Sequence, residues 1–131
     1  MRRFVLLAAL LCLTGSVAFA QDPVKVDPKH YKVEFENANV RVLKIHYGPH
    51  EKSVMHHHPD SVVTFLTDAH IKFTMPDGTT NEHSVKAGDS QWNAAGSHLP
   101  ENLGDTPMEA TLVELKHPVV AAKPAPKPPA K

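Results

Sequence analysis

Histidine is the residue type in this chain that could do chemistry: there are ten, and three stand together as His56, His57 and His58. Imidazole is the commonest metal ligand in proteins. On a β-strand His56 and His58 share one face and His57 points to the other, because side chains alternate. Two imidazoles on one face can reach a common ion, so a third ligand must come from elsewhere. His98 is the best candidate, since it follows Gly96-Ser97 on a loop or strand end.

A simpler interpretation remains open for the histidine run. Pro59-Asp60 follows it directly and favours a turn, in which the three side chains would lie at the surface. Four other histidines are expected at exposed strand or loop positions, and four large apolar residues are expected to pack inside. The two sets are His46, His50, His70 and His83, and Met55, Phe65, Phe73 and Trp92.

Cysteine chemistry is excluded for most of the chain. The one cysteine, Cys12, lies in an N-terminal segment that has a basic start at Arg2-Arg3, an apolar run, and Ala18-Phe19-Ala20 at its end. This pattern predicts a secretory signal peptide over residues 1–20 and an exported, periplasmic or secreted protein. The mature chain would have no disulfide and no thiolate ligand, so its stability must come from packing, a metal or oligomerisation.

Composition divides the mature chain into three parts. Residues 21–28 are a polar lead-in, expected to be a strand or loop, and residues 29–117 form one domain of about 89 residues. Residues 118–131 are rich in Pro, Ala and Lys and are expected to be a disordered, extended tail. A domain of this size has one small core, which excludes a two-domain enzyme.

The charge balance bears on partners. The chain has 14 basic and 14 acidic residues, and removal of Arg2 and Arg3 leaves 12 basic ones. Residues 29–117 carry 8 basic and 12 acidic residues, so no basic stripe for nucleic acid remains. The apolar run of the signal segment is too short to span a membrane, so no membrane insertion is expected after cleavage.

The elements that must position the histidines are predicted to be strands. Tyr31, Val33 and Phe35 alternate with charged residues, which is typical of a half-buried strand. Turn residues recur at regular spacing, as in Pro76-Asp77-Gly78. We find no convincing helix, and about eight or more short strands predict an all-β sandwich or barrel. The expected strands after the first are Val40–Ile45, Ser61–Leu66, His70–Met75, Glu82–Lys86, Ser90–Asn93 and Glu109–Leu115.

The joint pattern of Gly48 to Asn102 resembles the two motifs of the cupin superfamily. The first motif is a Gly followed by H-x-H and then a Glu, and the second runs from a Gly through P-x-G to a His and an Asn. The matching residues are Gly48 and His56-x-His58, then Gly88-Asp89, Ala94-Ala95-Gly96, His98 and Asn102. The resemblance implies a single-domain jelly roll, which agrees with the strand prediction.

The chain departs from the family pattern at the carboxylate ligand. The family's Glu would fall at Val62 or Val63, and Asp60 is a weak substitute because it sits close to the turn. Ala94 replaces the proline of the second motif, and one residue is missing before His98. The resemblance therefore implies a mononuclear site of three neutral imidazoles, His56, His58 and His98.

A three-histidine site would hold a divalent transition metal and leave open positions for a ligand. Imidazole does not distinguish among Fe, Zn, Cu, Ni and Mn. A net charge of +2 on the ion would favour an anionic ligand. Asn102, Trp92 and Val62 are candidates for a supporting or pocket role; for Trp92 the alternative is the core prediction already given.

Three functions follow from this pattern. The first is a metal-dependent oxygenase, isomerase or hydrolase acting on a small polar or anionic substrate. The second is a non-catalytic module that binds a small molecule, with a degenerate metal site or no metal. The third is metal handling, with His57 joining a looser surface site. A homodimer is expected by analogy with other single-domain cupins.

Overall fold

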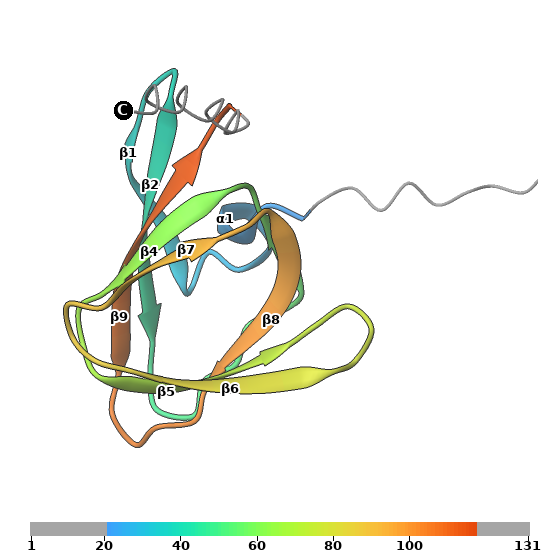
Figure 1. Ribbon diagram of the computed structural model, residues 1–131, viewed down its shortest axis with the longest axis vertical. Coiled ribbons are helices and arrows are strands. Elements are labelled where there is room, and N and C mark those ends of the chain that lie inside the picture. The colour runs from blue at the N-terminus through green and yellow to red at the C-terminus, as the bar shows by residue number, and fades with distance from the viewer. Residues whose placement is uncertain (1–20, 118–131) are drawn as a thin grey trace, which may run out of the picture.

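The computed structural model describes residues 21–117, so the predicted signal peptide and the predicted tail lie outside the described residues. The described chain folds into two antiparallel β-sheets that face each other (Figure 1). The prediction of an all-β jelly roll is confirmed. One sheet has five strands in the order β1-β2-β9-β4-β7, and the other has four in the order β3-β8-β5-β6.

The strands are short. Those of the five-stranded sheet are β1 (Tyr31–Glu36), β2 (Val40–Tyr47), β9 (Met108–Leu115), β4 (Ser61–Phe65) and β7 (Ser90–Asn93). Those of the second sheet are β3 (His56–His58), β8 (Gly96–Asn102), β5 (Ala69–Thr74) and β6 (Thr80–Val85).

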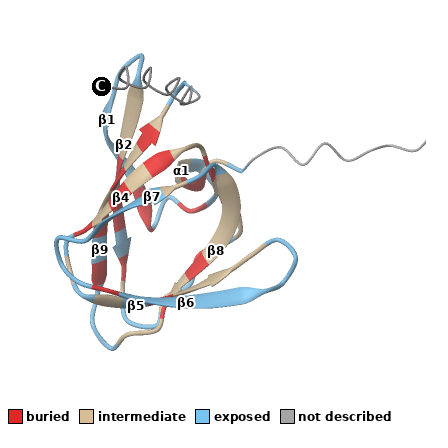
Figure 2. Cartoon of the chain, viewed as in Figure 1, coloured by how far each residue is buried: buried red, intermediate tan, exposed pale blue. Residues whose placement is uncertain are grey.

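Alternation along the central strands places the core between the sheets. Strand β9 buries Met108, Ala110, Leu112 and Glu114 and turns the residues between them outward. Its neighbours β2 and β4 show the same period of two, which is the pattern expected of a strand with one buried face (Figure 2). Phe65 is buried as predicted, and Phe73 packs against the core. The inward side chains of the five-stranded sheet therefore form one wall of the core, on the side opposite the sheet that carries the histidines.

The lead-in forms a helix, which contradicts the prediction of a strand or loop there. Helix α1 (Pro23–Val26) is a single turn. The Asp22 side chain accepts a hydrogen bond from the Val24 amide (3.0 Å), and Pro23 occupies the first helical turn, where a missing N–H costs nothing. The Gln21 carbonyl then accepts from the His57 amide (2.8 Å), which ties the lead-in to β3.

His98 lies near the start of strand β8, which agrees with the strand-end alternative and not with the loop. Strand β8 continues through Pro100, which lies opposite Phe73 of β5. Strand β3 pairs only with the first three residues of β8. Pro100 therefore lies beyond the end of β3, where its missing N–H breaks no pairing with that strand. Within residues 21–117, no helix has the length and apolar character needed to cross a membrane.

Candidate metal centre

The structure brings the three predicted ligand residues together. His56 and His58 are the two inward residues of β3, and His98 lies directly opposite His56 in β8. One ring nitrogen from each of the three residues lies within 4.8 Å of those of the other two. The period-two alternation explains why His57 is excluded, and its Nδ1 instead contacts the Ser97 hydroxyl at 3.2 Å.

The rings of His56 and His58 are oriented by bonds at Nδ1. His56 Nδ1 donates to the Val54 carbonyl (2.8 Å), and His58 Nδ1 donates to Glu114 Oε1 (2.6 Å). With Nδ1 carrying the proton, each neutral ring presents an Nε2 lone pair. A hydrogen bond from the second ring nitrogen to a carbonyl or carboxylate is the usual way in which a metal-binding histidine is fixed.

These bonds leave two acceptor atoms facing each other. His56 Nε2 and His58 Nε2 are 3.0 Å apart. Two lone pairs at this distance repel unless a cation lies between them or one ring gains a second proton. The distance is shorter than two metal–nitrogen bonds of about 2.0–2.1 Å placed end to end, so one ion can contact both atoms. The donor set therefore fits a divalent metal.

Burial keeps His56 and His98 neutral. It lowers the pKa of His56 to about 4, with a further contribution from His58. Burial also lowers the pKa of His98 to about 3, and His58 and His56 add to this effect. Desolvation disfavours the charged imidazolium, so these two rings are unprotonated and able to bind a metal at neutral pH.

A buried ion pair supports His58 from behind. Glu114 is 2% exposed and accepts from Arg41 Nε (2.6 Å) as well as from His58. Burial alone would raise the pKa of Glu114, but the hydrogen bonds from His58 and Arg41 outweigh it and hold the pKa below its usual value. Arg41 also donates to Asp22 (2.8 Å), so the lead-in contributes to the arrangement.

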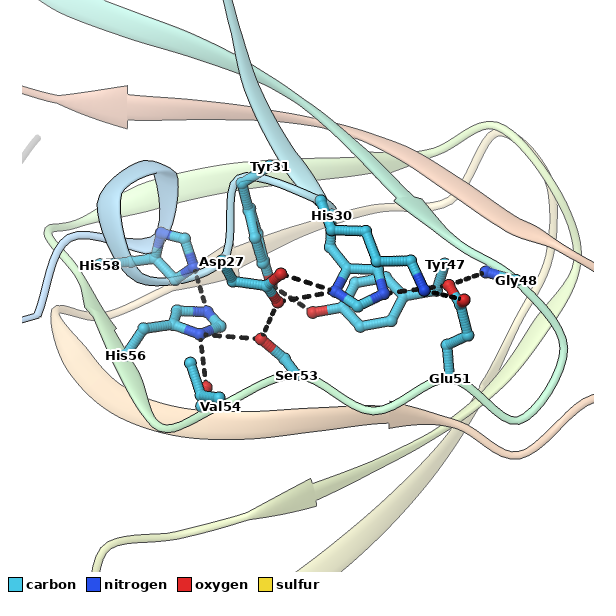
Figure 3. A network of polar contacts seen from close by, with 11 residues as sticks. Asp27, His30, Tyr31, Tyr47, Gly48, Glu51, Ser53, Val54, His56 and His58 are labelled. Carbon is cyan, nitrogen blue, oxygen red and sulfur yellow. Dashed lines mark hydrogen bonds and ion pairs between the residues drawn. The ribbon is translucent and has the colours of Figure 1, made fainter.

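A second polar network lies behind His56 (Figure 3). The Ser53 hydroxyl lies 3.4 Å from His56 Nδ1 and donates to Asp27. Asp27 accepts from His30 Nδ1 (2.7 Å), and His30 Nε2 faces Glu51 at 3.0 Å. The ring of His30 stacks on Tyr47 at a centroid distance of 4.2 Å. The network fixes the segment after β2 that leads into the histidines.

The cluster opens on a cavity of about 480 Å³ between the two sheets. His58 and His98 line it, whereas His56 lies behind them. Among residues 21–117, no Asp, Glu, Lys or Arg lines the cavity, and most of its walls are apolar side chains. A pocket of this size and character is typical of a small-molecule site.

Comparison with known proteins agrees with this architecture. No family model and no curated protein sequence matches the chain. The solved structure of a cupin domain from Bordetella pertussis is 25% identical with a TM-score of 0.62, over 66% of this chain and 92% of that one. A cupin family protein with a double-stranded β-helix fold from Methanocaldococcus jannaschii is 18% identical with a TM-score of 0.53, over 68% and 83%. The chain has the fold of the cupin superfamily.

The structure also places three other residues that the sequence singled out. Trp92 is 52% exposed and lines the cavity, so the prediction that it packs in the core is wrong and the alternative of a pocket position fits instead. Val62 lies on the outward face of β4, and the next residue, Val63, lines the cavity in its place. Asn102 donates to the carbonyls of Gly48 (3.0 Å) and Thr106 (2.9 Å), so it joins two loops.

Asp60 does not replace the missing glutamate of the family pattern. Its carboxylate accepts from the Ala95 amide (2.8 Å) and is not among the residues that could hold the ion. The remaining predictions of position hold more closely. His46, His50, His70 and His83 are exposed, as expected, and Met55 is half-buried.

Sequence reasoning missed the residues behind the histidines. Glu114 had a usable signal, because it continues the inward series of Met108, Ala110 and Leu112 on an alternating strand. A charged residue at an inward position indicates a buried partner. Asp27 and Ser53 had no comparable signal, because they lie outside the strands and meet His56 only through the tertiary fold.

Proposed function

We propose that the protein is an exported cupin that binds one divalent metal ion through His56, His58 and His98 and a small molecule in the adjoining cavity. The 3.0 Å approach of two Nε2 acceptors, each with its Nδ1 proton committed elsewhere, carries this proposal. When bound, the ion would supply a Lewis-acid centre with open coordination positions.

Side chains of the protein would orient the ligand rings, neutralise the buried carboxylate and exclude water from the cavity. Val54 and Glu114 fix the two rings of β3, and Arg41 neutralises the carboxylate so that it stays ionised in the interior. The apolar walls exclude water from the ligand, which strengthens the attraction between the ion and a negatively charged group. His98 lines the cavity and packs against Phe73 at a centroid distance of 5.0 Å.

The cavity favours chemistry at the ion over proton transfer by side chains. Tyr31 and Tyr47 line it, but burial raises the pKa of both phenols, and their hydroxyls bond to each other at 2.8 Å. No carboxylate of residues 21–117 faces the cavity as a general base. We therefore propose an oxygenase ahead of an isomerase. The same observation supports the second candidate, a non-catalytic small-molecule-binding protein.

Elemental analysis tests the proposal. The mature protein would be purified without a histidine tag beside a His56→Ala/His98→Ala variant and a His46→Ala/His70→Ala control, in which two exposed histidines away from the cavity are lost. We expect about one transition metal per chain in the wild type and the control, and none in the first variant. Wild-type protein without stoichiometric metal would refute the metal site.

Oxygen consumption separates the two candidates once metal is present. An oxygenase consumes oxygen with a ligand of the cavity, and a binding protein shows only a rise in melting temperature with that ligand. Export rests on the residue pattern of the first twenty residues, and comparison of the mature N-terminus with Gln21 tests it. The homodimer stays a prediction, and mass measurement in solution tests it.

A further inference from the structure

The cavity contains one buried hydroxyl without a partner. Ser61 is fully buried, and its Oγ is the single buried side-chain polar atom in residues 21–117 that has no hydrogen-bond partner. Leaving such a group unsatisfied costs about 1–3 kcal/mol. By contrast, the outward Thr64 of the same strand bonds the Ser90 hydroxyl at 2.8 Å. An apolar residue at position 61 would avoid this cost.

The strand places Ser61 against the cavity. Ser61, Val63 and Phe65 are the inward residues of β4, and all three line the cavity. In the sheet Ser61 pairs with Glu114 of β9, the residue that holds His58. Ser61 therefore lies on the side of the cavity where the histidines are.

The charges of the site restrict the ligand. Three neutral imidazoles leave the +2 charge of an ion uncompensated at the cavity, which favours an anionic group on the ligand. No Lys or Arg among residues 21–117 lines the cavity to hold a second anionic group. The walls include Val63, Phe65, Ile71, Phe73, Met108 and Leu112, which match an apolar body and not a polyhydroxylated one.

We propose that Ser61 binds the ligand of this cavity, and that the ligand is a monocarboxylate with an aromatic or branched aliphatic body. One carboxylate oxygen would reach the open positions of the ion beside His58 and His98, and the other would accept a hydrogen bond from Ser61 Oγ once rotation about χ1 turns the buried hydroxyl toward the ligand. This inference rests on the proposed metal site. It adds the ligand class and the residue that recognises it.

Calorimetric titration of the metal-loaded protein tests the inference, with phenylacetate and isovalerate as probes and acetate, succinate and glucose as comparisons. Phenylacetate and isovalerate should bind more tightly than all three comparisons. Acetate lacks the apolar body, succinate carries a second charge, and glucose has neither a carboxylate nor an apolar body. Acetate or succinate binding as tightly as phenylacetate, or no binding of phenylacetate, would overturn the proposal.

The residue assignment is tested with Ser61→Ala and a control, Thr64→Val, which removes an outward hydroxyl from the same strand. Ser61→Ala should weaken phenylacetate binding about tenfold, the value of a hydrogen bond to a charged group. It should leave metal content unchanged and keep or raise the melting temperature of the metal-free protein, since the hydroxyl has no protein partner. A purely structural serine would instead lower that melting temperature. Thr64→Val should leave the affinity unchanged.

Metal content measured on the same samples separates the two proposals. Without stoichiometric metal both fail. With metal present, equal phenylacetate affinity in wild type and Ser61→Ala overturns the inference alone. Ser61→Cys, which keeps the volume but has a weak donor, provides the same comparison if the alanine variant does not fold, and it too should weaken binding.

Discussion

The metal-binding capacity of the three histidines depends on which ring nitrogen carries the proton. His56 and His58 each commit Nδ1 to an oxygen of the protein, so both Nε2 atoms are free to act as ligands. Glu114 is the more consequential partner, because its negative charge makes the His58 ring a better electron donor as well as orienting it. The missing family glutamate is thus not replaced by another ligand. Instead, the Glu114 carboxylate accepts a hydrogen bond from the ligand residue His58 and does not itself face the ion.

Glu114→Gln tests this role at the residue scale. The amide oxygen can still accept from His58 Nδ1, but the charge is lost and Arg41 keeps only Asp22 as an ionic partner. We expect metal affinity to fall about 10–100-fold, the range typical for such outer partners. Competition with a chromophoric chelator measures it. Glu109→Gln on the same strand, whose side chain is 51% exposed, is the control. Unchanged affinity in Glu114→Gln would show that the carboxylate only fills space.

The buried histidines also set the acid stability of the metal-free protein. The pKa of His56 is lowered to about 4 and that of His98 to about 3, against about 6.5 in an unfolded chain. Below pH 6.5 the unfolded state therefore binds more protons than the folded state, and stability must decrease as the pH falls. The stabilisation that comes from these two neutral histidines is complete above about pH 6.5 and is lost progressively as the pH falls toward 3–4.

Urea titrations of the metal-free protein at pH 7 and pH 4.5 measure this dependence. Each of the two histidines adds at most about 1.4 kcal/mol per pH unit to the decrease. His56→Gln/His98→Gln should show a shallower dependence than the wild type, whereas His46→Ala, which removes an exposed ring, should not. Identical pH slopes in all three proteins would contradict the assignment of neutral, buried rings.

At the scale of elements, the single-turn helix α1 and strand β3 depend on each other. The lead-in supplies Asp22 to Arg41, Asp27 to the network behind His56, and the Gln21 carbonyl to the His57 amide. Strand β3 has only three residues and pairs on one side with β8 alone. A strand this short is not stable by itself, so its outer side is held by the lead-in.

Asp22 substitutions test the contribution of the lead-in. Asp22→Ala removes both the helix N-cap and the bond to Arg41, and we expect the free energy of unfolding to fall by about 1–2 kcal/mol. Asp22→Asn keeps the cap but removes the charge, so it should lose less. Urea denaturation measures both. Equal losses in the two variants would assign the whole effect to the ion pair and none to the cap.

At the scale of the whole molecule, the core does not depend on the ion. Buried side chains of both sheets form one hydrophobic cluster that includes Tyr47, Phe65, Ile71 and Leu112. This arrangement differs from small metal-dependent domains, which lack such a core and unfold when the metal is removed. The protein should therefore remain folded without metal and gain stability when it binds the metal.

Chelation tests the independence of the core. Metal removal should leave the β-sheet circular dichroism spectrum unchanged at 25 °C and lower the melting temperature. An ion present at 100 times its Kd would account for about 2.7 kcal/mol of stabilisation. The His56→Ala/His98→Ala variant should show no change on chelation. Unfolding of the wild type on chelation would show that the ion is a structural element.

The sequence predicted the fold class and the histidine cluster because both depend on local regularities. Alternation along the strands fixed which face of each is buried, and the same alternation placed His56 and His58 on one face and His57 on the other. It failed where a local signal conflicts with the global fold, as at Trp92, whose large apolar side chain suggested a core residue.

Only the tertiary structure decided which residues support the histidines and which residues line the cavity beside them. Glu114 is 56 residues from His58, and Asp27 is 26 residues from Ser53, so neither contact follows from spacing along the chain. The cavity and its unpartnered Ser61 hydroxyl likewise arise from which strands pair across the two sheets. A period of two tells which way a side chain points, but the residue that it meets is set by the order of strands in the sheets.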